Sequence, residues 1–429
     1  MKVLVTGATG LIGSAICARL ASEGHIVLGT TRDRAPAQSL AVSQWIQADM
    51  ARFTSPDAWR SALEGVDAVI NCVGVLQDSP REDLYAAHVA GVSALFEACE
   101  KFGIRRVIHF SAIGVDRAQV SDFSATKHQG DLALQRLHID WIILRPSVVL
   151  GRPVFGASAL IRGLAALPWV PVMGRTGELQ VVTLDDVVQT VVFFLDPAAP
   201  ARLELELAGP ERLSMADIIA HYRNWLGWKP ARRLQLPGPV AGLLYSAGDF
   251  AGLLGWRPPV RSTARKEIVR GAVGDPAQWT ERTGIQPKRL AAFLAETPAT
   301  VQERWFAKLY FLKPLVFIII VLFWLSTGII SLTTGFQIGV GLMVRAGTGV
   351  LAVPGVVAGA IADILVGLAV AYRPTTWHGL WAAIALSCFY IVAGTILLPE
   401  LWNEPLGPLL KIWPILALHF VALAILDER

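Results

Sequence analysis

The sequence predicts an α/β protein with a doubly wound parallel sheet and a small substrate lobe, followed by an all-α transmembrane domain of four helices. Two observations carry this prediction. Short runs rich in Val and Ile alternate with longer helical patterns from Lys2 to Leu144, which is typical of a parallel sheet built from β-α-β units. The 429 residues are 53% hydrophobic, and charged residues become rare after Lys313, so the apolar excess belongs to one end of the chain.

Six strands are predicted in the first part of the chain, because each run is short, rich in branched residues and bounded by turn or helix signals. They cover Val3–Thr6, His25–Thr30, Trp45–Ala48, Ala68–Cys72, Arg106–Ser111 and Trp141–Leu144. A helix is expected to begin at Ser55-Pro56-Asp57, since Ser caps helices and Pro suits the first helical position.

A glycine-rich loop follows the first predicted strand and opens a helix that runs to about Glu23. Glycine permits a tight turn, lets backbone N–H groups approach a pyrophosphate at the helix N-terminus, and lets helix and strand pack closely. This context predicts a Rossmann-type dinucleotide site. Its expected binding residues are Gly7, Thr9, Gly10, Leu11, Ile12 and Gly13.

The end of the second strand bears on the choice of cofactor. Arg32 stands where a site selective for NAD usually has an acid. Its guanidinium is a permanently charged donor fork suited to a 2′-phosphate, which favours NADP(H). Asp33 keeps NAD(H) an alternative, and a solvated surface role for Arg32 is the other interpretation. By topology, the same crevice is expected to contain Asp49, Met50, Asn71, Cys72, Val73 and Gly74.

Four apolar stretches follow Pro314, and each can span a hydrocarbon core of ~30 Å, which requires ~20 helical residues. They are Leu315–Thr334, Thr348–Tyr372, Trp377–Leu398 and Leu406–Leu426. The lipid bilayer is therefore a predicted partner. Lys and Arg form no run or stripe that favours a nucleic-acid partner, and the four cysteines have no spacing typical of a metal site.

The distribution of basic residues predicts the orientation of the membrane domain. Lys308 and Lys313 precede the first stretch, and Arg373 lies between the second and third. By the positive-inside rule, the N-terminal domain and the C-terminus are cytoplasmic. Arg345, in the first outward loop, argues against this orientation. Met1 leads directly into a strand without a cleavable signal, which also favours a cytoplasmic N-terminal domain.

Three segments follow from these patterns: residues 1–150 as the NAD(P)-binding domain, 151–305 as the substrate lobe with the remainder of that domain, and 306–429 as the membrane domain. After Pro146 the regular alternation is lost and the chain becomes rich in Pro, Gly and Trp. Within this lobe, Leu236–Trp256 is interpreted as a buried helix pair. An interfacial membrane segment is the alternative.

The first 300 residues or so resemble the extended and atypical short-chain dehydrogenase/reductases, especially the NmrA-like branch and the NAD(P)H-binding accessory subunit of mitochondrial complex I. Val181–Val187 is similar to the family's stretch that closes over the sheet. The matching motifs are Gly7–Gly13, Asp49, Asn71–Gly74, His109–Ala112, Lys127 and Arg145–Gly151. The resemblance implies further cofactor contacts from Ser111, Lys127, Pro146, Val148 and Val149.

Active members of that family use a Ser, a Tyr and a Lys four residues after the Tyr, and the Lys lowers the pKa of the phenol. Ser111 and Lys127 match as catalytic residues, but the Tyr position is Phe123, which has no proton to give. Substitutes are sought among Tyr85, His88, His109 and His128. Packed structural roles are the alternative for His88 and His109.

The C-terminal region resembles DoxX-like membrane domains. Asp363 and His419 lie within its apolar stretches, where ionisable groups are costly and usually face a bundle interior or a polar path. A proton- or quinone-related role is one interpretation. The other is that Asp363 hydrogen-bonds a neighbouring helix and that His419 sits near the membrane surface.

Two functions are therefore open. The first is a membrane-anchored NADP(H)-dependent oxidoreductase acting on a lipid- or quinone-like molecule. The second is a non-catalytic redox sensor, or an assembly or stabilising subunit of a membrane protein complex, and Phe123 favours it.

Overall fold

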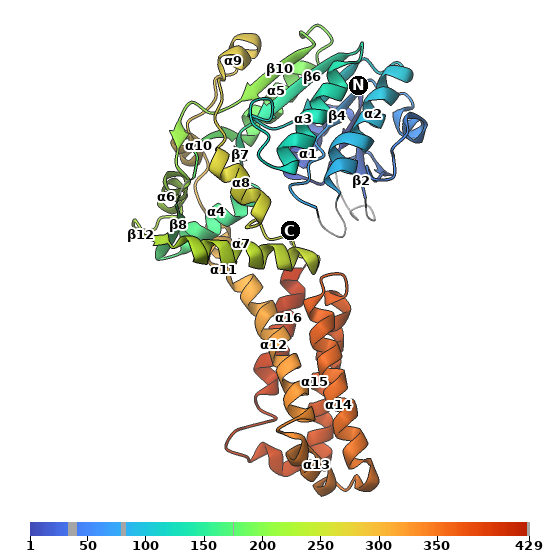
Figure 1. Ribbon diagram of the computed structural model, residues 1–429, viewed down its shortest axis with the longest axis vertical. Helices are drawn as coiled ribbons and strands as arrows, with labels where there is room; N and C mark the ends of the chain where they lie inside the picture. Colours follow the sequence, from blue (N-terminus) through green and yellow to red (C-terminus); the bar gives the residue numbers. More distant parts are fainter. Residues whose placement is uncertain (33–40, 79–82, 175, 427–429) are drawn as a thin grey trace. The chain divides into compact units, whose positions relative to one another are not determined.

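The computed structural model describes residues 1–32, 41–78, 83–174 and 176–426 (Figure 1). The chain forms two compact units. One contains Met1–Asp249 and Pro258–Ala307, and the other contains Phe250–Arg257 and Lys308–Arg429. The division of the first part at residue 150 stays a prediction, as does the boundary near residue 305.

A seven-stranded parallel sheet forms the centre of the first unit, in the order β10-β6-β5-β4-β1-β2-β3 (Figure 1). The order along the chain reverses between β1 and β4, and doubly wound folds bind ligands at the carboxyl ends of the strands at such a point. The predicted parallel sheet is confirmed. Its strands are β1 (Lys2–Thr6), β2 (Ile26–Thr31), β3 (Gln44–Gln47), β4 (Ala68–Asn71), β5 (Arg106–Phe110), β6 (Asp140–Pro146) and β10 (Leu203–Leu207).

Helices cover both faces of this sheet, which explains why its strands are nearly continuous apolar runs. Val3 and Val5 of β1 pack with α1 (Leu11–Ser22) and α5 (Leu184–Leu195). Leu4 points to the opposite face and packs with α2 (Gly91–Lys101) and Leu134 of α3 (Asp122–Gln135). Val182 and Leu184 belong to the first of these cores, so the stretch resembling the family's closing segment does pack over the sheet.

The helix expected at Ser55 is much shorter than a regular α-helix. Two 3-10 turns, η1 (Pro56–Trp59) and η2 (Ser61–Leu63), replace it. The segment must bury Trp59, Ala62 and Leu63 and then return within a few residues to β4. Trp59 is fixed by the bond from its indole N–H to the carbonyl of Phe53, at 3.2 Å. The burial of these side chains and the short connection to β4 therefore limit each of the two helical segments to a single turn.

A smaller lobe follows β6 and has its own core, centred on residues such as Leu150, Ile161 and Tyr222. Two small sheets, β11-β9-β7 and β12-β8, lie in it. The strands are β7 (Val148–Leu150), β8 (Trp169–Met173), β9 (Leu179–Thr183), β11 (Arg212–Leu213) and β12 (Arg232–Leu236). The helices are α4 (Ala157–Ala166), α6 (Met215–Trp225), α8 (Ser262–Arg270), α10 (Leu290–Glu296) and α11 (Val301–Leu309), whereas α9 (Ala277–Thr283) packs with its Trp279 on the core of the large sheet.

The segment interpreted as a buried helix pair is one helix, α7 (Gly238–Leu253). Leu243 is 71% exposed and Phe250 is 63% exposed, so the buried-pair prediction is wrong. The physical reason is the distribution of small residues. Gly248 faces inward, because a Cβ there would lie 1.8 Å from the carbonyl oxygen of Val260, and the large apolar side chains are therefore left on the outer side.

The second unit is a helical bundle in which α12 contacts α14 and α16, and α15 contacts α14 and α16 (Figure 1). Three helical segments are long and apolar enough to cross a membrane: Leu312–Leu332, Gly349–Ala371 and Thr376–Leu397. They correspond to the first three predicted spans. The fourth corresponds to α16, which has only 15 residues. The helices are α12 (Leu312–Leu332), α13 (Phe336–Arg345), η4 (Gly349–Leu351), α14 (Ala352–Ala371), α15 (Thr376–Leu397), η5 (Pro399–Trp402) and α16 (Ile412–Leu426).

Replacing Gly91 with alanine should destabilise the first unit, because a Cβ at Gly91 would lie 2.2 Å from the carbonyl oxygen of Met50. Overpacking of this kind costs about 1–3 kcal/mol. Chemical denaturation of the full chain in detergent, followed by circular dichroism, measures the loss. Gly174→Ala is the matched control, since nothing lies within 4 Å of its Cβ position. Equal stability of the two variants would contradict the close approach.

Candidate functional site

The loop between β1 and α1 is packed so tightly that glycine is required at both of its ends. Gly7 has φ of 69°, and a Cβ there would lie 2.8 Å from the carbonyl carbon of Cys72. A Cβ on Gly13 would lie 2.3 Å from the carbonyl oxygen of Gly7. The loop therefore holds the start of α1 against the ends of β1 and β4.

The first turn of α1 is suited to an anion. Its N-cap residue is Gly10, and within the described chain no side chain caps this end of the helix. The first N–H groups of a helix lack intrahelical partners and carry partial positive charge. Leu11 and Ile12 turn their side chains onto the core, so they can offer a ligand only backbone groups. This cradle fits the pyrophosphate of a dinucleotide.

Asn71 orders the opposite wall of the crevice. Its Oδ1 accepts from the hydroxyl of Thr6 at 2.6 Å and from the backbone N–H of Val73 at 3.2 Å. Its Nδ2 donates to Nδ1 of His109 at 2.9 Å. Asn71 is fully buried, and it thereby fixes the course of Cys72, Val73 and Gly74 at the carboxyl end of β4.

Lys127 joins the ends of two strands. Its ammonium donates to the carbonyl oxygens of Val73 and Phe110, both at 2.9 Å. The side chain is buried, and desolvation lowers the pKa of Lys127 to about 8, although Asp131 and Cys72 act to raise it. The ammonium lies 3.9 Å from the Cβ position of Gly74, which places it beside the segment expected to line the crevice.

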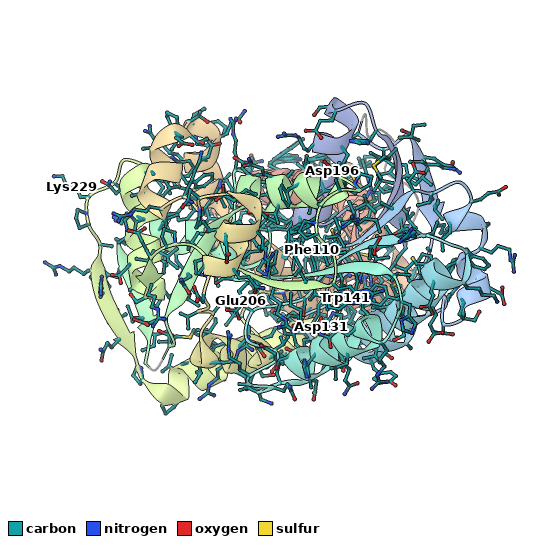
Figure 2. All side chains as sticks on the ribbon, turned by 90° about the horizontal axis from the view of Figure 1, so that it is seen from above. Phe110, Asp131, Trp141, Asp196, Glu206 and Lys229 are labelled. Atoms are coloured by element: carbon teal, nitrogen blue, oxygen red, sulfur yellow. The ribbon has the colours of Figure 1, made fainter. Side chains whose placement is uncertain are left out.

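Ser111 is committed to a buried ion network and not to the crevice. Its hydroxyl donates to Oδ2 of Asp131 at 2.9 Å. The same oxygen accepts from Nη2 of Arg145 at 3.0 Å, and Oδ1 of Asp131 lies 3.4 Å from Nε2 of His109. Figure 2 labels Asp131 on α3, together with Phe110 and Trp141 on the neighbouring strands β5 and β6.

Charge balance explains how Asp131 stays ionised inside the protein. Burial acts to raise the pKa of this carboxyl, but the contacts from His109, Arg145 and Ser111 outweigh it and hold the pKa below its ordinary value. Burial lowers the pKa of His109 despite the nearby carboxylate, so the imidazole is neutral. Arg145 also pairs with Glu204 at 2.7 Å and with Asp116 at 3.3 Å, which completes the network.

Phe123 lies on the first turn of α3 and packs with Val75, Leu84 and Ala87. Its ring meets that of His88 edge to face, with centroids 5.7 Å apart. The residues that the structure places against Phe123, namely Val75, Leu84, Ala87 and His88, include no phenol or carboxylic acid. The position four residues before Lys127 therefore offers a substrate an apolar surface.

Most of the proposed substitutes for the missing tyrosine already have hydrogen-bond partners within the protein. His88 Nε2 accepts from the N–H of Val75 at 3.0 Å, and its Nδ1 lies 3.0 Å from the hydroxyl of Thr126. Burial lowers the pKa of His88 far below its ordinary value. His109 is held by Asn71 and Asp131. The packed roles considered for His88 and His109 are thus the ones observed, while Tyr85 is 59% exposed.

The remaining predicted cofactor residues lie near the carboxyl ends of the strands, with different exposure. Arg32 follows β2 and is exposed, whereas Asp33 lies outside the described residues. Asp49 is half-buried after β3, but Met50 turns its side chain into the core. Cys72 and Val73 are half-buried, as are Thr9, Pro146, Val148 and Val149.

Sequence reasoning missed Asp131 and the full role of Arg145. Asp131 follows Lys127 by four residues, so both share one face of α3. That spacing of two opposite charges was the available signal, but it is also typical of a solvated helix surface. Only the fold reveals that this face is buried against β5 and β6.

In the second unit, Asp363 hydrogen-bonds a neighbouring helix, as one interpretation expected. The hydroxyl of Tyr390 on α15 donates to Oδ1 of Asp363 on α14 at 2.8 Å. His419 is completely buried in the bundle, and its place near the membrane surface stays a prediction. Its Nε2 accepts from the indole N–H of Trp324 at 2.9 Å. Each ionisable group is thereby paired across two helices.

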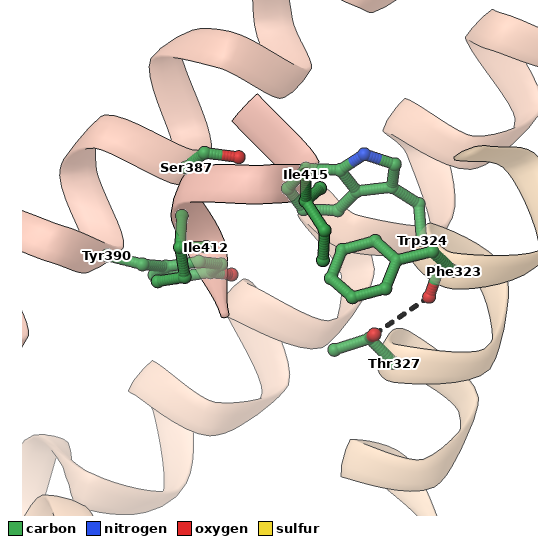
Figure 3. A pocket seen from close by; sticks show the side chains of 7 residues that line it. All are labelled: Phe323, Trp324, Thr327, Ser387, Tyr390, Ile412 and Ile415. Atoms are coloured by element: carbon green, nitrogen blue, oxygen red, sulfur yellow. Dashed lines mark hydrogen bonds between the residues drawn. The ribbon is translucent and has the colours of Figure 1, made fainter. Parts of the chain in front are cut away.

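A pocket of about 60 Å³ lies beside these groups, within the bundle. Figure 3 shows that the side chains of three helices face it and that the hydroxyl of Thr327 donates to its own helix, to the carbonyl oxygen of Phe323. The lining is mostly apolar, with three hydroxyl groups. It consists of Phe323, Trp324, Thr327, Ser387, Tyr390, Ile412 and Ile415. Among the described residues, no cluster of three or more His, Cys, Asp or Glu side chains is placed to hold a metal ion.

The fold and crevice define a dinucleotide-binding protein of the doubly wound class. Residues 3–200 match the NAD dependent epimerase/dehydratase family, and residues 321–420 match the DoxX-like family. Each match covers less than half of the chain, so its first part is similar to the NAD dependent epimerase/dehydratase family and its last part to the DoxX-like family. The resemblance inferred from the motifs is confirmed at the level of both domains.

Individual relatives extend this picture. The 40 kDa subunit of NADH-ubiquinone oxidoreductase from Neurospora crassa is 26% identical over 301 residues, which are 67% of this chain and 76% of that protein. A ceramide reductase from Caulobacter vibrioides is 23% identical over 57% of this chain and 77% of its own length. The structure of UDP-glucuronic acid 4-epimerase from Bacillus cereus, in complex with UDP-glucuronic acid and NAD, superposes with a TM-score of 0.52 at 20% identity. It covers 72% of this chain and all of that one, and it shows the shared fold.

Replacing Asp131 with asparagine should destabilise the first unit strongly, because Arg145 would lose its fully buried counter-charge and keep only Glu204 and Asp116, which are partly exposed. Breaking a buried pair by removing one partner costs about 3–5 kcal/mol. Urea denaturation of the full chain in detergent, followed by circular dichroism, measures the change. Glu281→Gln, at an exposed position of α9, is the control and should change stability by less than about 0.5 kcal/mol. Similar midpoints for both variants would argue against a stabilising network.

Proposed function

We propose that this protein is a membrane-anchored NADP(H)-dependent oxidoreductase that acts on a lipid-like substrate. The observation that carries the proposal is the combination, in one chain, of a glycine-cradled crevice containing Lys127 and a domain of apolar spanning helices. A soluble substrate would not need such an anchor. A lipid or quinone, by contrast, is concentrated in the bilayer.

The cofactor is proposed to lie along the carboxyl ends of β1, β2, β4 and β5. The N–H groups at the start of α1 bind its pyrophosphate, and Arg32 binds a 2′-phosphate, which favours NADP(H) over NAD(H). Asp49 and Asn71–Gly74 line the crevice, and Lys127 orients the ribose near the reacting ring. Pro146, Val148 and Val149 close the site beyond β6. When bound, the cofactor supplies or accepts a hydride.

The side chains allow a carbonyl–alcohol interconversion in which protein groups position the substrate but do not donate the proton. Reduction adds a hydride to the carbonyl carbon and a proton to its oxygen. Phe123 has no proton, and the single proton of Ser111 is directed to Asp131. Water therefore protonates the oxygen, while Phe123 contributes apolar surface that suits an acyl or isoprenoid chain. Ser111 acts through Asp131 in this scheme, as part of the network that holds the strand ends, and it does not contact the substrate.

Support for a lipid-like substrate comes from two sources. The similar Caulobacter vibrioides protein is named a ceramide reductase, and ceramide is a membrane lipid. The DoxX-like domain ties the present chain to the bilayer. We propose that the membrane domain has four spans, with α16 as the fourth, and that both termini are cytoplasmic, since Arg373 and the basic residues before α12 lie at the same end of the predicted topology.

The reaction is tested with the purified full chain in lipid nanodiscs by stopped-flow absorbance of NADPH at saturating concentration. Oxidation that depends on an added oxo-lipid or on ubiquinone is expected, with the faster acceptor identifying the substrate class. Tight binding of NADPH without oxidation by either acceptor would overturn the enzymatic proposal.

Replacing Phe123 with tyrosine should raise the rate of carbonyl reduction by about 10²-fold or more, because positioned general acids contribute about 10²–10⁴-fold. The new phenol would stand four residues before Lys127, whose ammonium favours the phenolate. Single-turnover oxidation of NADPH with the oxo-lipid measures the change. Phe123→Leu is the control and should show no gain. An unchanged rate in the tyrosine variant would argue that the substrate carbonyl does not reach this position.

Charge reversal at Arg32 tests cofactor selectivity. Arg32→Glu should weaken NADPH binding by about 10-fold or more, since a charge-assisted hydrogen bond contributes about 1.5–3 kcal/mol, and should change NADH binding far less. Fluorescence titration of each reduced cofactor gives the two dissociation constants. Equal losses for both would remove the argument for phosphate recognition.

A second candidate is a non-catalytic role in a membrane complex, in which the dinucleotide stabilises the fold or reports redox state. Phe123 favours it, as does the similarity to the 40 kDa subunit of NADH-ubiquinone oxidoreductase. An enzyme must oxidise and reduce the bound cofactor, whereas a sensor needs only binding that shifts a conformational equilibrium. The stopped-flow experiment separates the two.

A further inference from the structure

The outer half of α7 is apolar and exposed to an unusual degree. Val240, Leu243, Leu244, Phe250 and Leu253 are 44–71% exposed. At 100° per residue they occupy one half of the helix circumference. Ser246 is the only polar residue in that half, and the helix contains no Lys, Arg or Glu. Helices that face water normally place charged residues on this side.

The inner half of α7 is bound to the first unit. The hydroxyl of Tyr245 contacts Sδ of Met173 at 2.7 Å, and Gly248 packs on the backbone of Val260. Asp249, the only charged residue of α7, accepts from Gln77 Nε2 at 2.9 Å and from the N–H of Ser262 at 3.2 Å. The Tyr245 hydroxyl and the Asp249 carboxylate therefore have partners within the first unit, and the inner half of the helix is anchored there.

The chain after α7 is fixed at one end of the spanning helices, within the second unit. The indole N–H of Trp256 donates to the carbonyl oxygen of Ala371 at 2.8 Å, and the N–H of Arg373 donates to Leu254 O at 2.9 Å. The Trp256 ring also packs on Phe317 of α12, with centroids 4.9 Å apart. Arg373 separates two spans, so this end of the bundle lies at the boundary between membrane and water.

The exposed apolar row of α7 therefore ends, at Phe250 and Leu253, beside the membrane boundary. Both belong to the second unit. Their exposed fractions, 63% and 67%, match those of Leu322 and Ile396 at 57% and 72% on the spanning helices, whose exposed side chains face lipid. Leu244, Leu243 and Val240 continue the same exposed row along α7.

We propose that α7 is an interfacial helix whose outer half is immersed at the acyl–headgroup boundary of the bilayer. Membrane-surface helices bury their apolar half about 5–10 Å into this region. In α7 the protein itself covers the polar half, so no basic residues are needed. The partner is a lipid surface, and the proposal does not depend on the reaction or on the identity of the cofactor.

The test uses the full chain with Cys388, which is exposed, and Cys72, which is half-buried, replaced by serine, so that only the buried Cys17 and Cys99 remain. Single cysteines at Leu243, Leu244 and Phe250 are spin-labelled, and the protein is placed in nanodiscs of phosphatidylcholine and phosphatidylglycerol. Power-saturation electron paramagnetic resonance compares collisions with oxygen, which partitions into lipid, and with a water-soluble nickel chelate. Leu234→Cys is the matched control, since Leu234 lies on β12 and is 49% exposed.

Labels on α7 are expected to collide more with oxygen than with nickel, whereas the label at Leu234 should show the reverse. Nickel access on α7 equal to that at Leu234 would overturn the proposal. Protection from both reagents would also overturn it, because a protein surface, either a second copy or another partner, would then cover the helix. Hydrogen exchange is measured for the unlabelled full chain and for each labelled protein as an independent check of folding. An unchanged exchange pattern shows that the label has not disturbed the fold, so that each outcome can be interpreted.

Discussion

The buried carboxylate of Asp131 is the interaction on which the first unit most depends. It lies on α3 and contacts side chains from β5 and β6, including Arg145 through Nη2 at 3.0 Å and Ser111, which directly follows β5. His109 then extends the network to Asn71 and Thr6, at the ends of β4 and β1. Four neighbouring strand ends are thus held by one chain of polar contacts. The carboxylate is tolerated in the interior because Oδ2 accepts from Ser111 and Arg145, and Oδ1 lies 3.4 Å from Nε2 of His109.

This network also determines what the crevice can do. It uses the hydroxyl of Ser111 and the ring nitrogens of His109, so these groups are withdrawn from acid–base chemistry. Lys127 is bonded to the two strand ends at Val73 and Phe110, and its lowered pKa reflects burial. What remains accessible is a backbone cradle for phosphate and an apolar surface at Phe123. The site is therefore better equipped to hold a dinucleotide and an apolar chain than to move protons.

The sequence allowed the sheet and the spanning helices to be predicted because their signals are local. The β-α-β alternation and the position of Gly7–Gly13 after a strand can be recognised from neighbouring residues alone. The three long apolar segments can be recognised by their length. The Asp131 network was missed because it joins residues from separate elements, and a Lys-Asp pair four residues apart resembles a solvated surface. The buried helix pair was predicted for Leu236–Trp256 because apolar content alone does not state which side faces protein. The direction of Gly248 decides that, and it depends on tertiary packing.

The two units are not joined end to end. The chain leaves the first unit after Asp249, returns to it at Pro258 and leaves again after Ala307, so three covalent connections link them. The excursion Phe250–Arg257 carries Trp256, whose ring and indole N–H find their partners among the spanning helices. Removal of the C-terminal helices would leave Trp256 in the chain without the partners of its ring and its indole N–H. The segment Phe250–Arg257 therefore depends on the spanning helices for its contacts, although both of its ends are joined to the first unit.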